Sequence, residues 1–408
     1  MLDKRVYWVH LQQCAGYAAE LKGFIEKYKT AENFYKLGAE EWKKCGIKGI
    51  ARRASKNLND KDINESQKIV DFCDEHSIYI ITPEDKRYPG NLLNIKDFPC
   101  VLYVRGNAEC LNKGLRIAVI GSRDPTIYGE RSATKIVQQL SKEKITIVSG
   151  GAIGIDSVAH KTAIFNDCDT ILVMGCGHGT NYLPENARLR KAVSRKGALV
   201  TEYPPYTAVE RFTFPQRNRI ISGMSEGVVI IEAAEKSGTF STARHAVKQN
   251  RDVFVLPGDI HSDAFAGSNK LIAENGAKAV FSASNILKTY GYEVSDDKIG
   301  SVSDEPFENI DVKMPKEKKK KNNKKSDASR DDEKITSKIE NNVNFDVESV
   351  SKNAQIVYNI MSDGVCLLDD ITRKSALEVR KVLTALVELQ MVQAIEMTAP
   401  NKYIIKSQ

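Results

Sequence analysis

The sequence lacks the features of a membrane or secreted protein. No apolar run approaches the roughly 20 residues that a helix needs to cross a bilayer. The first residues, MLDKRVYWVH, contain neither the long apolar core nor the small-residue cleavage site of a signal peptide. The eight cysteines form no Cys-x-x-Cys pair, which argues against a zinc site. We therefore expect a cytoplasmic protein that makes no membrane contact and keeps reduced thiols in its core.

The chain has little excess charge outside one basic run. Its formal net charge is +7, and seven lysines lie between residues 316 and 325, in KEKKKKNNKK. The net charge is mild evidence for an anionic partner, and these seven lysines are enough to supply it. A run of this composition is typical of a solvated linker, and loose contact with phosphates is the second interpretation.

The basic run also marks the clearest domain boundary. At 408 residues the chain exceeds one ordinary core, and two or three domains are expected. Residues 294–345 are poor in apolar side chains and show no amphipathic period, which predicts a flexible linker. The linker separates a core domain, residues 81–293, from a C-terminal domain, residues 346–408.

The C-terminal domain has the pattern of a winged helix. An apolar stripe at helical spacing lies within residues 375–392: Leu377, Val379, Val382, Leu383, Leu386 and Leu389. Two short strands around a turn at residues 399–401 follow, which completes the order helix, short strand, helix, helix, hairpin. The expected recognition helix mixes cations with acids: Lys374, Arg380, Lys381, Glu378 and Glu388. This pattern leaves DNA binding and protein contact equally open.

Residues 1–80 favour a mainly helical N-terminal domain. The most helix-like segments are AAELKGFIEKY and ASKNLNDKDINESQKIVDFCDEH. In CGIKGIARRA, residues 45–54, glycines precede a basic helix start, as in helix-hairpin-helix turns that hold phosphate with backbone N–H groups. Short Gly-x-x-Gly turns are common, so a plain turn between helices is the favoured interpretation.

The central part alternates apolar strands with helical patterns. The strands are RIAVIG, ITIVSG, DTILVMG, ALVTE, GVVIIEA and DVFVLPG, each followed by a segment of helical character. Continuous apolar strands in repeated β–α units predict a mainly parallel sheet that helices cover on both faces. The expected fold class is α/β with a doubly wound, Rossmann-like core, whose ligand crevice lies at the carboxyl ends of the strands.

Small residues recur at these strand ends. The segments are Gly121-Ser122-Arg123, Ser149-Gly150-Gly151, Gly175-Cys176-Gly177, Glu202-Tyr203-Pro204-Pro205, Glu232-Ala233-Ala234 and Pro257-Gly258. Cations in the same loops are Arg123, Arg217, Arg219 and Lys236. Glycine lets a backbone approach a phosphate, and helix N-termini offer N–H donors, so the group predicts an anion-binding crevice.

The glycine cluster SGGAIGIDSVAH does not match a dinucleotide site. The fingerprint G-x-G-x-x-G places glycines at offsets 0, 2 and 5, whereas Gly150, Gly151 and Gly154 lie at offsets 0, 1 and 4. The next strand, DTILVMG, ends without the acid that would hold a ribose. We expect no cofactor and no metal. Asp156 is expected to cap the following helix, and His160 to pack against the sheet.

Eight motifs in matching order resemble the DNA processing protein A family (DprA, also called Smf). They are GSR, SGGAIGIDSVAH, YLPEN, TEYPP, FPQRNRIISGMS, EAAEKSGTFSTARHA, VFVLPG and GSNKLI followed by GA, over about residues 80–290. The resemblance implies a non-enzymatic protein that binds single-stranded DNA, protects it and helps load RecA recombinase during natural transformation. It also implies a homodimer built through the Rossmann-like core.

The arginine of the GSR motif lies in the DNA pocket of that family, and here it is Arg123. Many members have Tyr-Pro-Lys-Glu-Asn where this chain has YLPEN, so the contact of that lysine is not carried over. Candidates for base stacking are Tyr182, Tyr203, Phe212 and Phe214, although aromatic residues in such positions more often belong to the core. The candidate DNA-contacting residues are Gly121, Ser122, Arg123, Ser149, Gly150, Gly151, Tyr182, Asn186, Arg217, Asn218, Arg219, Lys236 and Ser237.

Two other functions are the alternatives. Nucleoside-monophosphate phosphoribohydrolases of the lysine-decarboxylase-like type share the fold class, but EKSGTFST, residues 235–242, lacks their paired glycines and following carboxylate. Glu232 ends its strand without a second acid placed to form an acid–base pair. A winged-helix transcription regulator with a sensing core is the third hypothesis, and it requires the C-terminal helix to dominate DNA binding.

Overall fold

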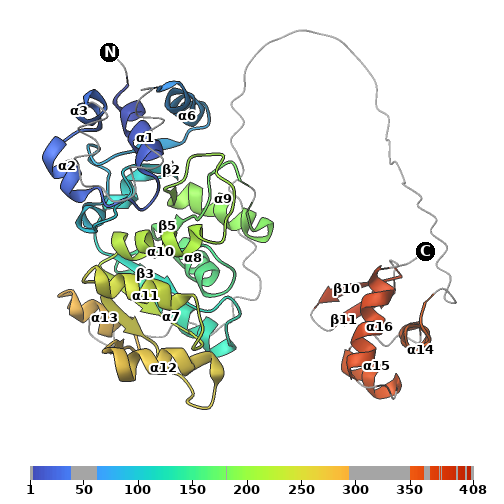
Figure 1. The fold of residues 1–408 in the computed structure, drawn as a ribbon. Coiled ribbons are helices and arrows are strands. Elements are labelled where there is room, and N and C mark those ends of the chain that lie inside the picture. The colour runs from blue at the N-terminus through green and yellow to red at the C-terminus, as the bar shows by residue number, and fades with distance from the viewer. Residues whose placement is uncertain are drawn as a thin grey trace, which may run out of the picture. The chain divides into compact units, whose positions relative to one another are not determined.

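The computed structural model describes residues 3–37, 62–180, 182–293, 350–362, 368–375, 377, 379–391, 394–399 and 402–405. The chain divides into two compact units, residues 1–317 and residues 318–408 (Figure 1). The expected linker, residues 294–345, and the Gly-x-x-Gly turn at residues 45–54 lie outside the described residues.

One sheet forms the centre of the larger unit. Its strands are β1 (Tyr79–Ile81), β2 (Leu102–Gly106), β3 (Arg116–Ile120), β4 (Thr146–Ser149), β5 (Thr170–Val173), β6 (Ala198–Thr201), β7 (Gly227–Ile230), β8 (Asp252–Val255) and β9 (Lys278–Ala279). They lie in the order β1-β2-β6-β5-β4-β3-β7-β8-β9. β2 pairs antiparallel with β1 and with β6, and every other neighbouring pair is parallel. The mainly parallel α/β sheet predicted from the sequence is confirmed.

Alternate side chains of the strands enter two separate cores. On β3, Ile117 and Val119 join one core, whereas Ala118 and Ile120 join the other, as the two-residue period of a strand requires. The first face is covered by α7 (Ile127–Lys142), α8 (Ile155–Phe165), α9 (Ala187–Lys196) and α13 (Ala283–Thr289). The second face is covered by α10 (Thr213–Met224), α11 (Thr239–Lys248) and α12 (Asp263–Asn275). Burial on both faces explains the continuous apolar strands.

The strand order reverses at β3, which pairs with β4 on one side and with β7 on the other. The chain passes through β4, β5 and β6 and then returns through α10 to β7 beside β3. In a doubly wound sheet, the loops diverge at such a point and leave a crevice at the carboxyl ends of the strands. The topology therefore places the crevice between the loops that follow β3 and β7.

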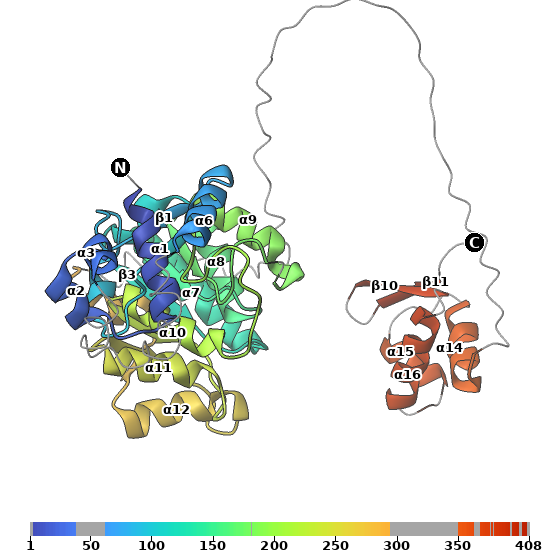
Figure 2. The same cartoon turned by 45° about the horizontal axis from the view of Figure 1, so that its top comes forward.

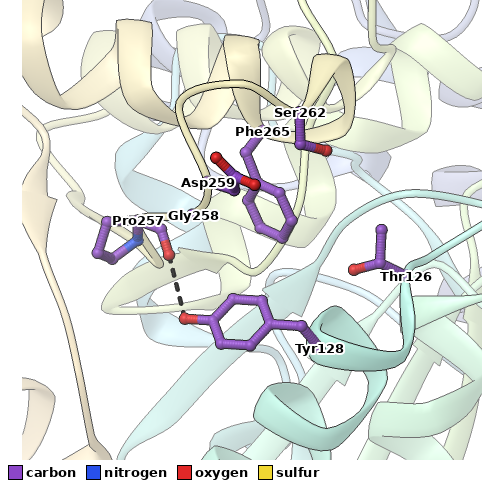
Figure 3. A pocket seen from close by; sticks show the side chains of 7 residues that line it. All are labelled: Thr126, Tyr128, Pro257, Gly258, Asp259, Ser262 and Phe265. Carbon is purple, nitrogen blue, oxygen red and sulfur yellow. Dashed lines mark hydrogen bonds between the residues drawn. The ribbon is translucent and has the colours of Figure 1, made fainter.

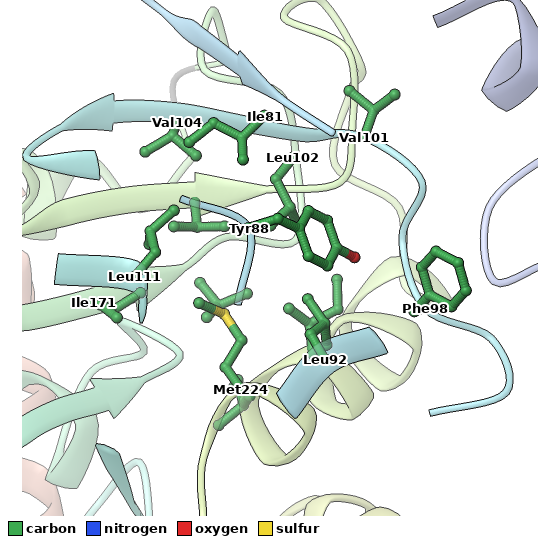
Figure 4. Packing of buried hydrophobic residues seen from close by; sticks show 14 of the residues in the cluster. Ile81, Tyr88, Leu92, Phe98, Val101, Leu102, Val104, Leu111, Ile171 and Met224 are labelled. Atoms are coloured by element: carbon green, nitrogen blue, oxygen red, sulfur yellow. The ribbon is translucent and has the colours of Figure 1, made fainter. Parts of the chain in front are cut away.

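The N-terminal helices share the core of the sheet. Those described are α1 (Lys4–Ala15), α2 (Lys22–Tyr28), α3 (Ala31–Lys36) and α6 (Asn64–Glu75), and short 3-10 helices follow at η1 (Gly90–Asn94), η2 (Ala108–Asn112) and η3 (Pro184–Asn186). Trp8 of α1 belongs to the same apolar cluster as Ile81 and Met224 of α10, part of which Figure 4 shows. Tyr103 of β2 donates from its hydroxyl to Gln12 Oε1 over 3.0 Å. The domain boundary expected at residue 80 therefore falls inside β1.

The smaller unit contains α14 (Lys352–Ser362), α15 (Leu368–Ser375), α16 (Val379–Met391), β10 (Ile395–Ala399) and β11 (Lys402–Ile405) among its described residues. β10 and β11 pair antiparallel, in the element order expected for a winged helix. The short strand expected between the first two helices lies outside the described residues. Val382, Leu386 and Leu389 are buried, but Val379 is 54% exposed, so its predicted place in the apolar stripe is wrong.

Candidate nucleic-acid interface

Arg123 is an exposed cation at the carboxyl end of β3. Its loop is held by Ser122, whose hydroxyl donates to the carbonyl O of Asp124 over 2.9 Å. Among the described residues no hydrogen bond or ion pair engages the Arg123 guanidinium, so neither Asp124 nor Glu130 neutralises it. The charge acts on Tyr182: burial raises the pKa of that phenol, and Arg123 opposes the rise. Arg123 is thus an unneutralised cation within electrostatic range of an aromatic ring.

The glycines that follow β4 make room for the protein's own side chains. A Cβ at Gly150 would lie 2.4 Å from Nη1 of Arg217, and a Cβ at Gly151 would lie 2.7 Å from the side chain of Leu172. Gly151 also has a φ of +69°, which disfavours any side chain. The idea that these two glycines leave space for a phosphate is therefore corrected, because internal packing fills that space.

Gly154 brings two of the crevice loops into contact. A Cβ there would lie 2.4 Å from the carbonyl O of Ser122, and its φ of +83° is in the left-handed region. The next residue, Ile155, donates its backbone N–H to the same oxygen over 3.1 Å. The first turn of α8 is therefore anchored directly to the loop that carries Arg123. Gly154 occupies the cap position of α8 that was expected for Asp156, which lies inside the helix and is buried.

Arg217 is hydrogen-bonded to the backbone of the loop after β4. Its side chain is buried, and Nη1 donates to the carbonyl oxygens of Gly150, at 2.6 Å, and Val173. Burial lowers the pKa of Arg217, and the nearby carboxylate of Asp156 opposes that shift. The sequence-based assignment of Arg217 as a direct phosphate ligand is thus corrected: it braces the crevice floor and places a positive charge beneath it.

Arg219 lies on a different side of α10 from Arg217 and contacts Glu202 instead of the loop after β4. Its side chain is 1% exposed, and Nη2 lies 2.5 Å from Oε2 of Glu202. Tyr203 is also fully buried, with its hydroxyl donating to the carbonyl O of Thr213 over 3.3 Å. The predictions that Arg219 binds phosphate and that Tyr203 stacks on a base are both wrong, because neither side chain reaches solvent.

Ser149 and Asn186 are also internal. Ser149 is fully buried and donates to the carbonyl O of Val119 over 2.7 Å. The Asn186 amide donates to the carbonyl O of Gly151 over 3.1 Å and to Oγ of Ser157 over 2.9 Å. Both side chains shape the loop after β4 instead of contacting a ligand, which corrects their assignment from the sequence.

Three of the aromatic candidates are at least partly exposed. Tyr182 is half-buried, and its ring centroid lies 5.1 Å from that of Phe214. The Phe214 ring lies 6.0 Å from the guanidinium carbon of Arg217. Phe212, just before α10, is 54% exposed. Tyr182, Phe212 and Phe214 therefore stay candidates for base stacking, and only Tyr203 is removed from the group.

The loop after β7 contributes a second exposed cation. Lys236 is exposed, and within the described part of the chain nothing pairs with its ammonium group. Ser237 donates from Oγ to Thr239 Oγ1 over 2.9 Å, and Thr239 Oγ1 in turn donates to the carbonyl O of Gly121 over 3.4 Å. The loops after β3 and β7 are therefore linked across the switch point, and Lys236 lies on the same edge as Arg123.

Glu232 has a structural role at the end of β7. The carboxylate is fully buried and accepts hydrogen bonds from the backbone N and the hydroxyl of Thr126, at 3.0 and 2.6 Å. A Cβ at Gly129 would lie 2.4 Å from Oε2 of Glu232, so the glycine permits this contact. The sequence analysis missed this contact between Glu232 and Thr126. The pattern Thr126-x-x-Gly129 is typical of a capped helix start and indicates where α7 begins. The carboxylate is thus committed to the start of α7.

A hollow that the sequence did not predict lies between the start of α7 and the loop after β8 (Figure 3). Its lining is Thr126, Tyr128, Pro257, Gly258, Asp259, Ser262 and Phe265. Tyr128 donates from its hydroxyl to the carbonyl O of Pro257 over 3.2 Å, the dashed line in the figure. Asp259 is the only charged side chain in this lining, so the hollow does not suit a phosphate.

The described cysteines agree with the predicted reduced thiols. Cys14, Cys73, Cys100, Cys110, Cys168 and Cys176 are free and buried. Burial raises the pKa of Cys14 to about 12, which keeps this thiol protonated. Within the described ranges, no group of three or more His, Cys, Asp or Glu side chains is arranged to hold a metal, and no helix is long and apolar enough to cross a membrane.

The sequence also matches a known family. Residues 79–291 match the family model of the DNA recombination-mediator protein A. The chain belongs to this family. The DNA processing protein DprA of Bacillus subtilis (strain 168) is 36% identical over 239 residues, which cover 59% of this chain and 80% of the relative. The resemblance stated from the eight motifs is therefore confirmed.

A solved family structure has the same fold. The X-ray structure of DNA processing protein A from Streptococcus pneumoniae aligns with a TM-score of 0.63 at 30% identity, covering 72% of this chain and all of the other. In a sequence comparison, the DprA of S. pneumoniae (strain ATCC BAA-255 / R6) is 39% identical over 208 residues, or 51% of this chain and 73% of the relative. This chain therefore shares the fold of a solved member of the DNA recombination-mediator protein A family.

Proposed function

We propose that this protein binds single-stranded DNA across the carboxyl edge of its sheet. The observation that carries the proposal is the exposed Arg123 guanidinium, which no described carboxylate neutralises. A guanidinium in this state offers a forked set of donors that suits phosphate oxygens. Membership of a family whose relatives are named DNA processing proteins supports the same function.

The proposed contact follows the exposed residues along the edge. Arg123 and Lys236 neutralise phosphates, while the buried charge of Arg217 strengthens the positive field from below. Tyr182 and Phe212 stack on bases, a contact that tolerates any sequence. Binding is therefore expected to depend strongly on salt and weakly on base composition.

We further propose that the protein protects the bound strand and helps load RecA recombinase in the cytoplasm during natural transformation, as a homodimer formed through the core. Three exposed apolar side chains support an interface there: Ile127 at 72%, Tyr128 at 50% and Ile260 at 83%. They belong to the segments that form the hollow of Figure 3, and clustered apolar exposure of this kind marks protein contacts. Light scattering of the purified chain tests the dimer, and RecA filament formation on protein-coated single strands tests loading.

The decisive experiment measures binding of the full chain to single-stranded and duplex oligonucleotides of equal length across a salt series. Tighter binding of the single strand, with an affinity that falls steeply as salt rises, is the expected result. Equal binding of both forms, or no binding, rejects the proposal. A preference for duplex that resides in residues 346–408 would favour the winged-helix regulator.

The enzyme alternative has a direct test as well. Because the Glu232 carboxylate is bonded to Thr126, the residue that caps α7, we expect no release of base from AMP or a related monophosphate. Sustained turnover that disappears in Glu232→Gln would favour the phosphoribohydrolase.

A further inference from the structure

A strongly basic helix lies on the flank of the sheet. The sequence of α9, ARLRKAVSRK, contains five basic residues and no acid. Leu189, Ala192 and Val193 are buried against the sheet, which turns the opposite face of the helix to solvent. α9 packs beside α8 on this flank, as Figures 1 and 2 show.

Arg190 and Lys196 each contact a neighbouring segment of the protein. Lys196 forms an ion pair with Asp167. Arg190 donates from Nη1 to the carbonyl O of Leu183 over 2.9 Å, and burial lowers its pKa. Arg190 thereby ties α9 to the segment before it, and Lys196 ties the last residue of the helix to Asp167.

Three exposed cations of α9 form one stripe. Arg188, Lys191 and Arg195 are all exposed, and their spacing of i, i+3 and i+7 places them on a single helix face. Between residues 182 and 196, Glu185 is the only acid, and it lies before the first turn of the helix. The stripe therefore presents net positive charge to solvent along the whole length of α9.

The stripe starts at the crevice. η3 immediately precedes α9, and there the Asn186 amide is bonded to the carbonyl O of Gly151, in the loop after β4. Arg188 lies in the first turn of the helix and Arg195 in the last. Because α9 lies between the carboxyl end of β5 and the start of β6, it runs from the crevice edge along the flank. The charge of the crevice is thus continued outward by the helix.

We propose that Arg188, Lys191 and Arg195 form a second phosphate-binding track, along which single-stranded DNA continues after it leaves the crevice. Seven residues of helix span about 10 Å. A stacked strand advances about 3.4 Å per nucleotide, so the track accommodates about three nucleotides. Single-stranded DNA is the occupant because the stripe is continuous with the proposed crevice and complementary in charge to a phosphate chain. This inference rests on the proposed function of the crevice.

The test uses the full chain with Arg188, Lys191 and Arg195 all changed to Ala. Oligothymidylates of about 6 nucleotides, which fill the crevice alone, are expected to bind as they do to the wild type. Oligothymidylates of about 30 nucleotides are expected to bind about tenfold more weakly or worse, and the slope of log affinity against log salt is expected to fall by about 2. The matched control changes Lys68, Lys248 and Lys288 to Ala. These lysines are exposed on α6, α11 and α13, and their substitution removes the same amount of positive charge.

Several results overturn the track. It is wrong if the α9 variant binds long strands with wild-type affinity and slope, or if the control variant is weakened as much. Loss of RecA loading with unchanged DNA affinity would assign the stripe to a protein contact instead. A second variant changes only Arg188 and Lys191 to Ala, so that any effect of Arg195 on folding is avoided. Thermal unfolding of this variant should equal that of the wild type.

The failure of the track and the failure of the crevice are distinguishable. Arg123→Ala weakens binding of short and long strands alike, whereas the α9 variant weakens binding of long strands alone. If Arg123→Ala has its expected effect and the α9 variant has none, the crevice stands and the track is rejected. If the wild type binds no single strand of any length, both are rejected.

Discussion

Arg219 and Glu202 form a buried ion pair, with 2.5 Å between Nη2 and Oε2 and with 1% and 3% of their side chains exposed. Glu202 also accepts a hydrogen bond from the backbone N of Ala18, and Gln12 of α1 donates to its carbonyl O. Burial works against the charge, but the carboxylates of Glu202 and Asp97 raise the pKa of Arg219. The pair therefore joins α10 and the loop after β6 to the N-terminal helices.

Arg219→Ala should lower the free energy of unfolding by about 3–5 kcal/mol, because it leaves the Glu202 carboxylate buried and unpaired. Urea unfolding measures the decrease. Arg188→Ala, at an exposed position, is the control and should change stability by less than about 0.5 kcal/mol. Unchanged stability of Arg219→Ala together with weaker DNA binding would return Arg219 to the interface.

Gly154→Ala should destabilise the protein by about 1–3 kcal/mol and weaken DNA binding, because its Cβ would strike the Ser122 carbonyl from a left-handed backbone. Gly238→Ala is the matched control. Gly238 has a φ of −61° and nothing within 4 Å of an added Cβ, so a change of less than about 1 kcal/mol is expected. Thermal unfolding of the two variants side by side decides the point, and equal stability would remove the packing role of Gly154.

Arg123→Ala should weaken single-strand binding whatever the base sequence. The slope of log affinity against log salt should decrease by about 0.7 for each phosphate that the arginine no longer neutralises. Thermal unfolding should not change, since the guanidinium has no bonded partner among the described residues. Lysine at position 123 should restore part of the affinity, because it keeps the charge without the forked geometry. A destabilised alanine variant with an unchanged salt slope would make Arg123 a structural residue.

A chain that ends at residue 293 should keep most of the single-strand affinity. It retains the whole sheet and every crevice loop, which belong to the first of the two compact units. Fluorescence anisotropy with the shortened chain, and with residues 346–408 alone, separates the two contributions. If the C-terminal piece binds well and the shortened chain does not, the crevice is not the principal site.

Acidification should destabilise the protein through His160. This ring is fully buried and bonded through Nδ1 to Oγ1 of Thr170 over 2.7 Å, and burial lowers its pKa to about 3. The unfolded chain takes up a proton near pH 6.5, well above the folded pKa, so the stabilisation is fully present above pH 6.5 and declines as the pH falls. Between pH 7 and pH 5 the decline from this group should be about 2 kcal/mol. Urea unfolding at both pH values measures the decline in the free energy of unfolding. The decline should be smaller for His160→Gln than for the wild type. For His261→Gln, a change at an exposed position, it should equal that of the wild type.

Much of the fold follows from local pattern. Apolar strands such as TIVS and TILV, separated by helices, predicted the parallel sheet and its two covered faces, because the two-residue period of a strand is written in the sequence. The same order of units places the carboxyl ends of the parallel strands on one edge, and this was enough to predict the edge on which the loops after them gather. Arg123, directly after β3, was identified from this reasoning and from the family motif, and the structure leaves it exposed.

The division of the arginines between crevice and core depends on packing between distant segments. In RNR, Arg217 and Arg219 are two residues apart on α10, so the helix turns them to different sides: one reaches Gly150 and the other Glu202. No local pattern separates them, because the partners that bury each side chain are 67 and 17 residues away. The glycines after β4 are a similar case. The space left by a missing Cβ can hold a ligand or a side chain of the protein, and only the tertiary fold decides which of the two is there. The sequence specifies the strands, the helices and the edge at which the strands end, because these depend on neighbours along the chain. The exposure of each polar side chain is different, because it is set by contacts that exist only after the helices have packed on the sheet.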